Sequence, residues 1–289
     1  MEVIRKPFEG EVEDVMGGSG RLEVQIHEHG LVALVDVMPR LVPKGKTADS
    51  AIVQAARVSY GEGTKQISED RGLIRYLYGH RHTSPLEMVE FKFHQVMPVF
   101  VARQWIRHRT ASVNEYSARY SIVKDRFFRP SMETIRQQSA VNKQGSDGTI
   151  DNLTASEFLE YLDIAEAQYE RYEKLAAKGV AREIARIGLP LSMYTEWYWK
   201  IDLHNLIHFL GLRMDKHAQQ EIRDYAYPIY ELIKPIVPLT MEAFMDYHPN
   251  MNGMWLSRQE IEAINGAQFT GSSREQAEFK EKKMRLGLD

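Results

Sequence analysis

The chain has 289 residues, of which 43% are hydrophobic, so it can bury a sizeable core in one or two domains. It contains no cysteine, which excludes disulfides, cysteine-ligated zinc, iron–sulfur clusters and any thiolate nucleophile. The net charge of -3 argues against a nucleic-acid binder, and no apolar run is long enough to suggest a membrane span. The charged N-terminus lacks the apolar segment of a signal peptide, so we expect a cytoplasmic protein.

The N-terminal half carries the clearest strand patterns. Residues Arg21–Val37 hold two β-rich runs around Glu28–Gly30, which predicts a hairpin. Phe91–Val96 alternates polar and apolar residues and predicts a half-buried strand. Between them the sequence predicts a loop and two helices, in the order Pro39–Thr47, Asp49–Ser59 and Ser68–His80. Ser68 is the expected cap of the second helix.

Helical periodicity dominates the C-terminal half. The capping-box sequence Thr154–Glu157 predicts the start of a long helix that runs to about Ala177 and is ended by Gly179. Tyr194–Ile201 is aromatic and β-prone, which predicts a further strand. The other helices are expected at Arg182–Ile187, Leu203–Met214, His217–Ile233 and Thr240–Tyr247.

These patterns predict an α+β fold, with a small mixed or antiparallel sheet, flanking helices and a helical C-terminal half. The polar stretch Gln137–Asn152 predicts a surface loop, and the chain beyond Gly266 predicts a frayed tail or a late helix. No linker divides the chain, so we expect one domain over residues 21–250. An N-terminal extension (1–20) and a C-terminal tail (251–289) would flank it.

The densest set of hydrogen-bonding side chains runs from Arg107 to Tyr120 and reads RHRTASVNEYSARY. It follows a helix predicted over Val99–Arg107. An extended backbone would place Glu115, Ser117 and Arg119 on one face. Such a face suits a nucleotide, because a guanidinium binds phosphate while hydroxyl and carboxylate groups bind phosphate or sugar.

The residues alone leave other readings open. Arg-His-Arg by itself is explained by a solvated surface loop, and an RNA-binding role is disfavoured by the net charge. Serine catalysis at Ser112 or Ser117 would need an oriented base, and no G-x-S-x-G context surrounds either residue. His204 and His208 have the spacing of a helical metal pair, but Asn205 replaces the glutamate of H-E-x-x-H, so we expect no metal.

The segment resembles the signature of the flavin-dependent thymidylate synthases, R-H-R-x-x-S-x-N-E-x-S-x-R. Its eight fixed positions are matched by Arg107, His108, Arg109, Ser112, Asn114, Glu115, Ser117 and Arg119. Further segments are similar to the family in the family's order, namely His82–Glu87, Pro98–Trp105, Arg182–Pro190 and Leu212–Gln219. The resemblance covers roughly residues 20–250.

The resemblance implies reductive methylation of dUMP to dTMP. Methylenetetrahydrofolate would be the carbon donor, FAD and NADPH the reductant, and the enzyme a homotetramer with shared active sites. The missing cysteine agrees, since the other class of thymidylate synthase attacks dUMP with a thiolate. The alternative is a nucleotide- or flavin-binding regulatory module without turnover.

The resemblance also assigns roles to individual positions. The residues expected to contact FAD are Ser84, Arg107, His108, Arg109, Glu115, Asp202, Leu203, His204 and His208, although relatives often carry Arg and Asn at the last two positions. The residues expected around dUMP are Gln104, Trp105, Ile106, Arg107, Glu115, Tyr116, Ser117, Ala118, Arg119, Arg186 and Arg213. His82 is expected near the folate, and with Ser84 it would come from a neighbouring subunit. Arg213 is the expected catalytic residue, because a fixed cation beside the uracil stabilises the anionic base.

Overall fold

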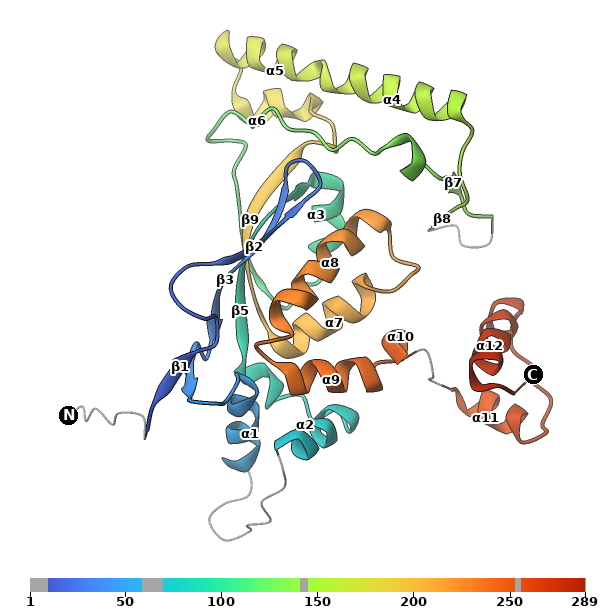
Figure 1. Cartoon of the computed structure of the whole chain (residues 1–289). Helices are drawn as coiled ribbons and strands as arrows, with labels where there is room; N and C mark the ends of the chain where they lie inside the picture. Colours follow the sequence, from blue (N-terminus) through green and yellow to red (C-terminus); the bar gives the residue numbers. More distant parts are fainter. Residues whose placement is uncertain (1–9, 59–69, 141–144, 253–255, 289) are drawn as a thin grey trace.

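The computed structural model describes residues 10–58, 70–140, 145–252 and 256–288 (Figure 1). Its strands are β1 Val12–Asp14, β2 Leu22–Ile26, β3 Gly30–Met38, β4 Leu41–Pro43, β5 Glu90–Pro98, β6 Ser112–Glu115, β7 Gln137–Gln138, β8 Ser146–Asp147 and β9 Tyr194–Asp202. Its α-helices are α1 Asp49–Val58, α2 Asp70–Gly79, α3 Val99–Trp105, α4 Asn152–Glu166, α5 Gln168–Ala177, α6 Arg182–Ala185, α7 Leu203–Arg213, α8 Gln220–Ile233, α9 Pro238–Tyr247, α10 Pro249–Asn252, α11 Arg258–Ile264 and α12 Ser273–Leu286. Short 3₁₀ helices are η1 Leu86–Met88, η2 Met132–Thr134 and η3 Arg186–Gly188.

The central element is a five-stranded antiparallel sheet in the order β2-β3-β5-β9-β6. Its middle ladder joins β5 and β9 over their whole length, from Glu90 opposite Asp202 to Pro98 opposite Tyr194. β6 pairs only with β9, so the segment that carries the signature lies at the sheet edge. Two small sheets, β1-β4 and β7-β8, lie outside this one.

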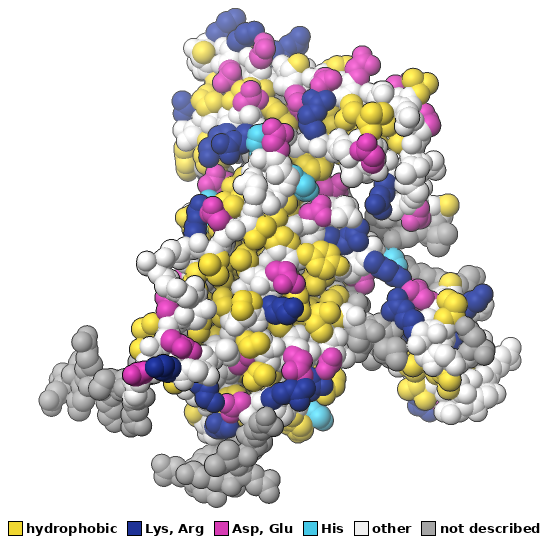
Figure 2. Space-filling view, viewed as in Figure 1, with side chains coloured by type: hydrophobic (Ala, Val, Ile, Leu, Met, Phe, Trp, Pro, Cys, Tyr) yellow, Lys and Arg dark blue, Asp and Glu magenta, His cyan; other side chains and the backbone are white. Residues whose placement is uncertain are grey.

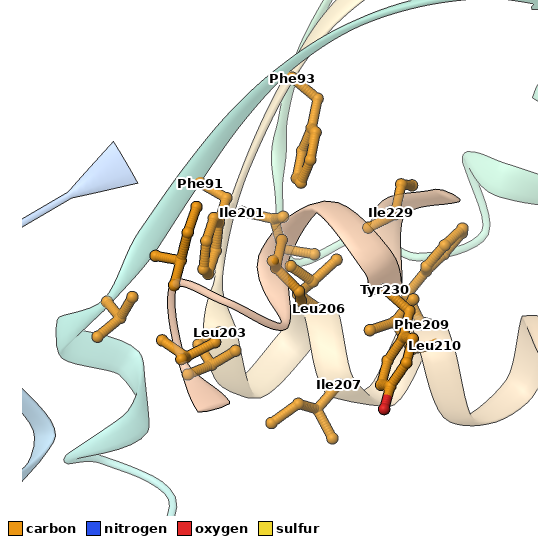
Figure 3. Packing of buried hydrophobic residues seen from close by; sticks show 14 of the residues in the cluster. Phe91, Phe93, Ile201, Leu203, Leu206, Ile207, Phe209, Leu210, Ile229 and Tyr230 are labelled. Atoms are coloured by element: carbon orange, nitrogen blue, oxygen red, sulfur yellow. The ribbon is translucent and has the colours of Figure 1, made fainter. Parts of the chain in front are cut away.

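One face of the sheet carries the core. On β5 and β9 every second side chain is buried, as the period-two pattern requires. Phe91, Phe93 and Ile201 from the sheet pack with side chains of α7 and α8 such as Leu206 and Ile229 (Figure 3). Figure 1 accordingly places α7 and α8 along one side of the sheet.

Trp105 is the residue that joins α3 to this core. Its side chain is 1% exposed and meets the ring of Trp199 at 5.2 Å edge to face, and the ring of Phe209 at 4.6 Å. These contacts tie the end of α3 to the sheet and to α7 at once. The backbone that leaves α3 is therefore held close to the C-terminal half of α7.

The other face of the sheet is polar. Lys92, Tyr198 and Lys200 are exposed there, and the ammonium of Lys92 lies 5.4 Å from the centre of the Tyr198 ring. His94 stacks on the same ring at 4.9 Å and contacts Glu196 at 2.8 Å. Among the described residues, no helix is long and apolar enough to cross a membrane.

The fold class agrees with the expectation from sequence, and so do the hairpin, the two central strands and the main helices. The region expected to be only a loop at Pro39–Thr47 contains β4, which pairs with β1. The polar stretch Gln137–Asn152 likewise contains the β7-β8 pair. Both strands are too short to leave a periodic pattern in the sequence.

The expected capping box at Thr154–Glu157 is wrong. Asp151 caps the helix instead, since its carboxylate accepts a hydrogen bond from the Thr154 amide at 3.0 Å, and α4 begins at Asn152. The helix is also divided at Ala167. Gly179 ends α5 as expected, with a left-handed φ of 93°.

Two further expectations concern the ends of helices. Of the two alternatives for the chain beyond Gly266, the late helix is confirmed, since α12 lies there and, like α11 before it, is opened by a capping box. The cap expected at Ser68 lies outside the described residues, and α2 begins at Asp70.

A buried carboxylate, that of Asp49, joins the start of α1 to the start of α9. Asp49, 2% exposed, accepts hydrogen bonds from the amides of Leu239 at 2.8 Å and Thr240 at 3.2 Å, and from the Thr240 hydroxyl at 2.6 Å. These amides open α9, so the first residue of α1 caps a helix that follows much later in the sequence.

Replacing this carboxylate tests the link. We expect Asp49→Ala to lower the free energy of unfolding by about 2–4 kcal/mol, because it removes a cap and leaves buried donors without an acceptor. Urea denaturation measures the change. The exposed cap Asp151 is a matched control, for which Asp151→Ala should cost only about 1 kcal/mol. Equal losses in both variants would contradict the role given to burial.

Candidate active site

The Arg-His-Arg sequence lies in a turn after α3 rather than inside the helix. α3 ends at Trp105, two residues earlier than expected. The His108 amide donates to the Trp105 carbonyl at 3.0 Å, which folds the chain back after the helix. Arg107 and Arg109 are exposed, whereas His108 is half-buried.

His108 and Arg213 meet at the ends of two helices. Nε of Arg213 donates to Nε2 of His108 at 3.1 Å, and its Nη2 donates to the backbone carbonyl of Gln104 at 3.3 Å. The centre of the His108 ring also lies 5.6 Å from that of His208, which belongs to α7. The structure therefore brings Gln104, His108, His208 and Arg213 into one cluster.

The electrostatics of this cluster keep His108 neutral. Burial, together with the electrostatic influence of Arg213 and His208, lowers the pKa of His108 to about 4. Burial also lowers the pKa of Arg213 from its ordinary value. Because arginine can only donate, Nε2 of His108 must be the acceptor and its proton must lie on Nδ1.

The signature continues along β6 and then turns. Residues Ser112–Glu115 are extended and pair with β9, and the Tyr116 amide still donates to the Glu196 carbonyl at 2.8 Å. From Ser117 the chain bends, with the Tyr120 amide donating to the Ser117 carbonyl at 3.1 Å. The expectation that Glu115, Ser117 and Arg119 share one face of a strand is therefore wrong.

The turn after β6 is joined to the segment that carries Arg186. Nη1 of Arg182, in α6, donates to the Tyr120 carbonyl at 2.8 Å. The Arg119 guanidinium lies 5.3 Å from the centre of the Tyr120 ring. Arg186 follows at the start of η3 and is exposed, like Arg119. The structure thus brings the two arginines expected at the nucleotide to neighbouring segments.

Two other assigned residues are held by the local fold. Glu115 accepts a hydrogen bond from the Thr195 hydroxyl at 2.6 Å, which fixes its carboxylate at the end of β6. Tyr116 donates its hydroxyl proton to the Ile122 carbonyl at 2.7 Å. Ile106, directly after α3, is exposed, and Ala118, in the turn after β6, is half-buried.

A third group of assigned residues comprises Asp202, at the start of α7, and His82 and Ser84, in the segment before η1. Asp202 caps this helix, and its carboxylate accepts from the Asn205 amide at 2.9 Å and from the Asn205 side chain at 2.7 Å. His82 and Ser84 are exposed in the segment before η1. Val89 follows η1, and its carbonyl accepts a hydrogen bond from the Leu203 amide at 2.8 Å. α7 has 11 residues and is about 16 Å long, so Asp202 lies a helix length from Arg213.

Two assigned side chains belong to the core. Trp105 is 1% exposed and Leu203 is fully buried, so neither side chain faces a ligand. Only the backbone at these two positions remains available. Apolar residues inside a binding motif carry no sequence signal that separates packing from contact.

A large cleft lies next to the cluster, with a volume of about 1430 Å³. The residues assigned from the resemblance do not line it. Its walls come from α4, from residues 189–192, from the segment between Arg213 and α8, and from α12. Gln219 on this wall accepts a hydrogen bond from the side chain of Gln104, which joins the cleft to the cluster. Gln219 lay in a segment similar to the family, but sequence reasoning gave it no role.

Comparison with known proteins decides the family. The profile described as "Thymidylate synthase complementing protein" matches residues 40–239. A flavin-dependent thymidylate synthase of Dictyostelium discoideum is 63% identical over 289 residues, which is 99% of this chain and 95% of that protein. The chain belongs to the flavin-dependent thymidylate synthase family.

A second relative and a solved structure are also similar to this chain. A flavin-dependent thymidylate synthase of Thermus thermophilus is 52% identical over 86% of each chain. The crystal structure of a UMP/dUMP methylase, PolB from Streptomyces cacaoi bound with 5-Br UMP, is 34% identical with a TM-score of 0.65. The match covers 95% of the PolB chain but 76% of this chain, so this chain has segments that the match does not include.

The signature, from Arg107 to Arg119, is one continuous segment that connects several parts of the site. It leaves α3, runs along the sheet edge as β6 and ends in the turn beside α6. Arg213 of α7 contacts its beginning and Arg186 lies near its end. Among the described residues no group of three or more histidines and carboxylates is arranged to hold a metal ion.

The pairing of His108 with Arg213 can be tested by titration. We expect Arg213→Ala to raise the pKa of His108 from about 4 toward 6.5, because the variant removes a neighbouring cation and admits water. The titration of the ring protons by NMR gives the value. Arg109→Ala is the control and should leave it unchanged. A His108 pKa that stays low in both variants would mean that Arg213 does not influence this ring.

Proposed function

We propose that this enzyme methylates dUMP to dTMP, with methylenetetrahydrofolate as carbon donor and FAD and NADPH as the reductant. The family and the names of its relatives support the reaction. The observation that carries the proposal is the setting of Arg213. Its half-buried guanidinium is held by a neutral ring and a carbonyl oxygen, and among the described residues it has no carboxylate partner. A positive charge in this setting is available to an anionic ligand.

The residues around His108 suit FAD. Arg107 and Arg109 are exposed and pair with no carboxylate in the part of the chain that the structure describes, so their charge is open to a diphosphate. His208 lies on α7 beside them. We assign Arg107, His108, Arg109 and His208 to the flavin nucleotide, with Glu115, Asp202 and His204 as further contacts. A bound flavin, once reduced, supplies the hydride that the methyl group requires.

The residues around the turn after β6 suit the nucleotide. Arg119 and Arg186 are exposed guanidiniums on joined segments, again without a carboxylate partner among the described residues. We assign them, with Ser117, to the phosphate of dUMP, because arginine binds phosphate through two parallel hydrogen bonds.

Arg213 acts on the base. The carbon that is methylated needs electron density, and this chain has no cysteine to supply it by attack on the ring. A guanidinium beside N3 and O4 stabilises the negative charge that gathers there, and the low polarity of a half-buried site strengthens the effect. Arginine remains protonated near neutral pH, so Arg213 stabilises charge and does not take up a proton.

Substitution of Arg213 is the direct test. We expect Arg213→Ala to lower the rate of dTMP formation at least 100-fold, while FAD absorbance in the purified protein is kept. Tritium release from C5-labelled dUMP, dependent on NADPH and methylenetetrahydrofolate, measures the rate. Arg171→Ala on the exposed side of α5 is the control. A flavin-containing wild-type protein without turnover would favour the alternative of a regulatory module.

We also propose that the active sites are shared between subunits of a homotetramer. His82 and Ser84 are exposed, and the family resemblance gives them to the site of a neighbouring subunit. Exposed apolar side chains support such a contact, and Figure 2 shows them over α4 and α5 at the top of the view. The most exposed of this layer are Leu153, Tyr161, Ile164, Ile184, Ile187 and Leu191.

Mixing two inactive variants tests the shared site. His82→Ala and Arg213→Ala proteins would each lack one half of every site. Mixed tetramers would contain sites with both halves intact, so we expect activity to return after the two are unfolded and refolded together. Size-exclusion chromatography with light scattering would give the number of subunits. If the mixture stays inactive while mixed tetramers form, each chain carries its own complete site.

A further inference from the structure

The C-terminal helices α11 and α12 lie beyond the residues that match the family profile. They pack on each other. The rings of Phe269 and Phe279 lie 4.8 Å apart, and Lys282 of α12 contacts Glu260 of α11 at 2.8 Å. Glu260 is only 4% exposed, so this pair is largely shielded from water. We call residues 258–286 the C-terminal hairpin.

The C-terminal hairpin meets the rest of the chain directly after Arg213. Nζ of Lys216 lies 2.6 Å from a carboxylate oxygen of Glu281 in α12. The same two residues line the large cleft. Figure 1 shows α12 set apart from the sheet and its helices. The ion pair is therefore a connection between an added element and the loop that follows Arg213.

The loop from Met214 to Gln219 is held by several contacts close to the candidate site. Arg213 contacts His108 at the start of the loop, and Gln219 contacts Gln104 at its end. In between, the Tyr227 hydroxyl donates to the Met214 carbonyl at 3.1 Å, and the His217 amide donates to the Asp215 carboxylate at 2.8 Å. Lys216 is the point at which the C-terminal hairpin acts on the same loop.

We propose that Glu281 and Lys216 are a positioning pair for the reaction. The pair holds the loop from Met214 to Gln219, and through both loop ends it orients Arg213 and Gln104 toward dUMP. The proposal rests on the role given above to Arg213. Neither residue of the pair touches the reacting atoms, so its loss acts indirectly, through Gln104 on dUMP binding and through Arg213 on the chemical step.

The size of the effect follows from the exposure of the pair. The two side chains are 56% and 44% exposed. Ion pairs of this kind contribute little, so we expect the KM for dUMP to rise about two- to fivefold when the pair is broken. The value of kcat should fall by no more than a similar factor, because Arg213 is displaced but not removed. The FAD content and the melting temperature should stay at wild-type levels. High salt should raise the wild-type KM to the level of the variant.

Single substitutions in the full-length, FAD-loaded enzyme test this. Lys216→Met breaks the pair from the loop, and Glu281→Gln breaks it from the C-terminal hairpin. Glu281 also pairs with Arg285 at 2.8 Å within α12, so Arg285→Gln is the matched control and should leave the KM unchanged. Loss of stability or of kcat in place of the KM change would overturn the positioning role.

A crosslink gives the reverse experiment. The chain has no cysteine, so Lys216→Cys with Glu281→Cys introduces the only two thiols. Lys and Glu side chains span more than a disulfide bridges, so a short bismaleimide is used to join them. We expect the unlinked double variant to have the raised KM and the crosslinked protein to regain the wild-type KM. Failure to crosslink, or a KM that stays raised after crosslinking, refutes the proposal.

The outcomes separate this inference from the proposed function. If Arg213→Ala abolishes turnover while Lys216→Met and Glu281→Gln behave as wild type, only the positioning pair is wrong. If Arg213→Ala is fully active, the role of Arg213 fails first, whatever the pair does.

Discussion

The packing of Trp105 is the contact on which the site depends. Its ring lies between the sheet and α7, touching both Trp199 and Phe209. Burial of one large aromatic side chain therefore fixes the place where α3 ends. Only because α3 ends there does His108 reach Arg213 at the end of α7. A core residue two positions before the signature thus decides the geometry of His108 and Arg213.

Much of the fold, and the family, could be predicted from the sequence, because strand and helix patterns and the signature each lie within a short stretch of residues. Alternation predicted β5, the aromatic, β-prone composition of Tyr194–Ile201 predicted β9, and the signature predicted the family, which the comparisons confirm. The bend at Ser117 could not be predicted, since alternating residues fit a strand or a turn equally well. The burial of Leu203 and the contact of Gln219 with Gln104 depend on tertiary packing between distant segments. The roles assigned to single site residues stay predictions.

The charges of the site follow a consistent arrangement. The arginines of the signature, with Arg186 and Arg213, have no carboxylate partner among the described residues, whereas some arginines elsewhere, such as Arg75 and Arg129, are paired with acids. His108 is held neutral beside them, so it adds a hydrogen-bonding group without a further positive charge. Folding gains nothing from unpaired cations, which is why they point to anionic ligands.

One carboxylate at the start of α7 serves two purposes at once. Asp202 accepts the first free amide of the helix, and the family resemblance also places it at the flavin. Any replacement there loosens the helix that carries Arg213 at its far end. A substitution of Asp202 that abolishes activity would therefore combine a loosened α7 with weaker flavin binding. Loss of activity alone would not show which of the two was responsible.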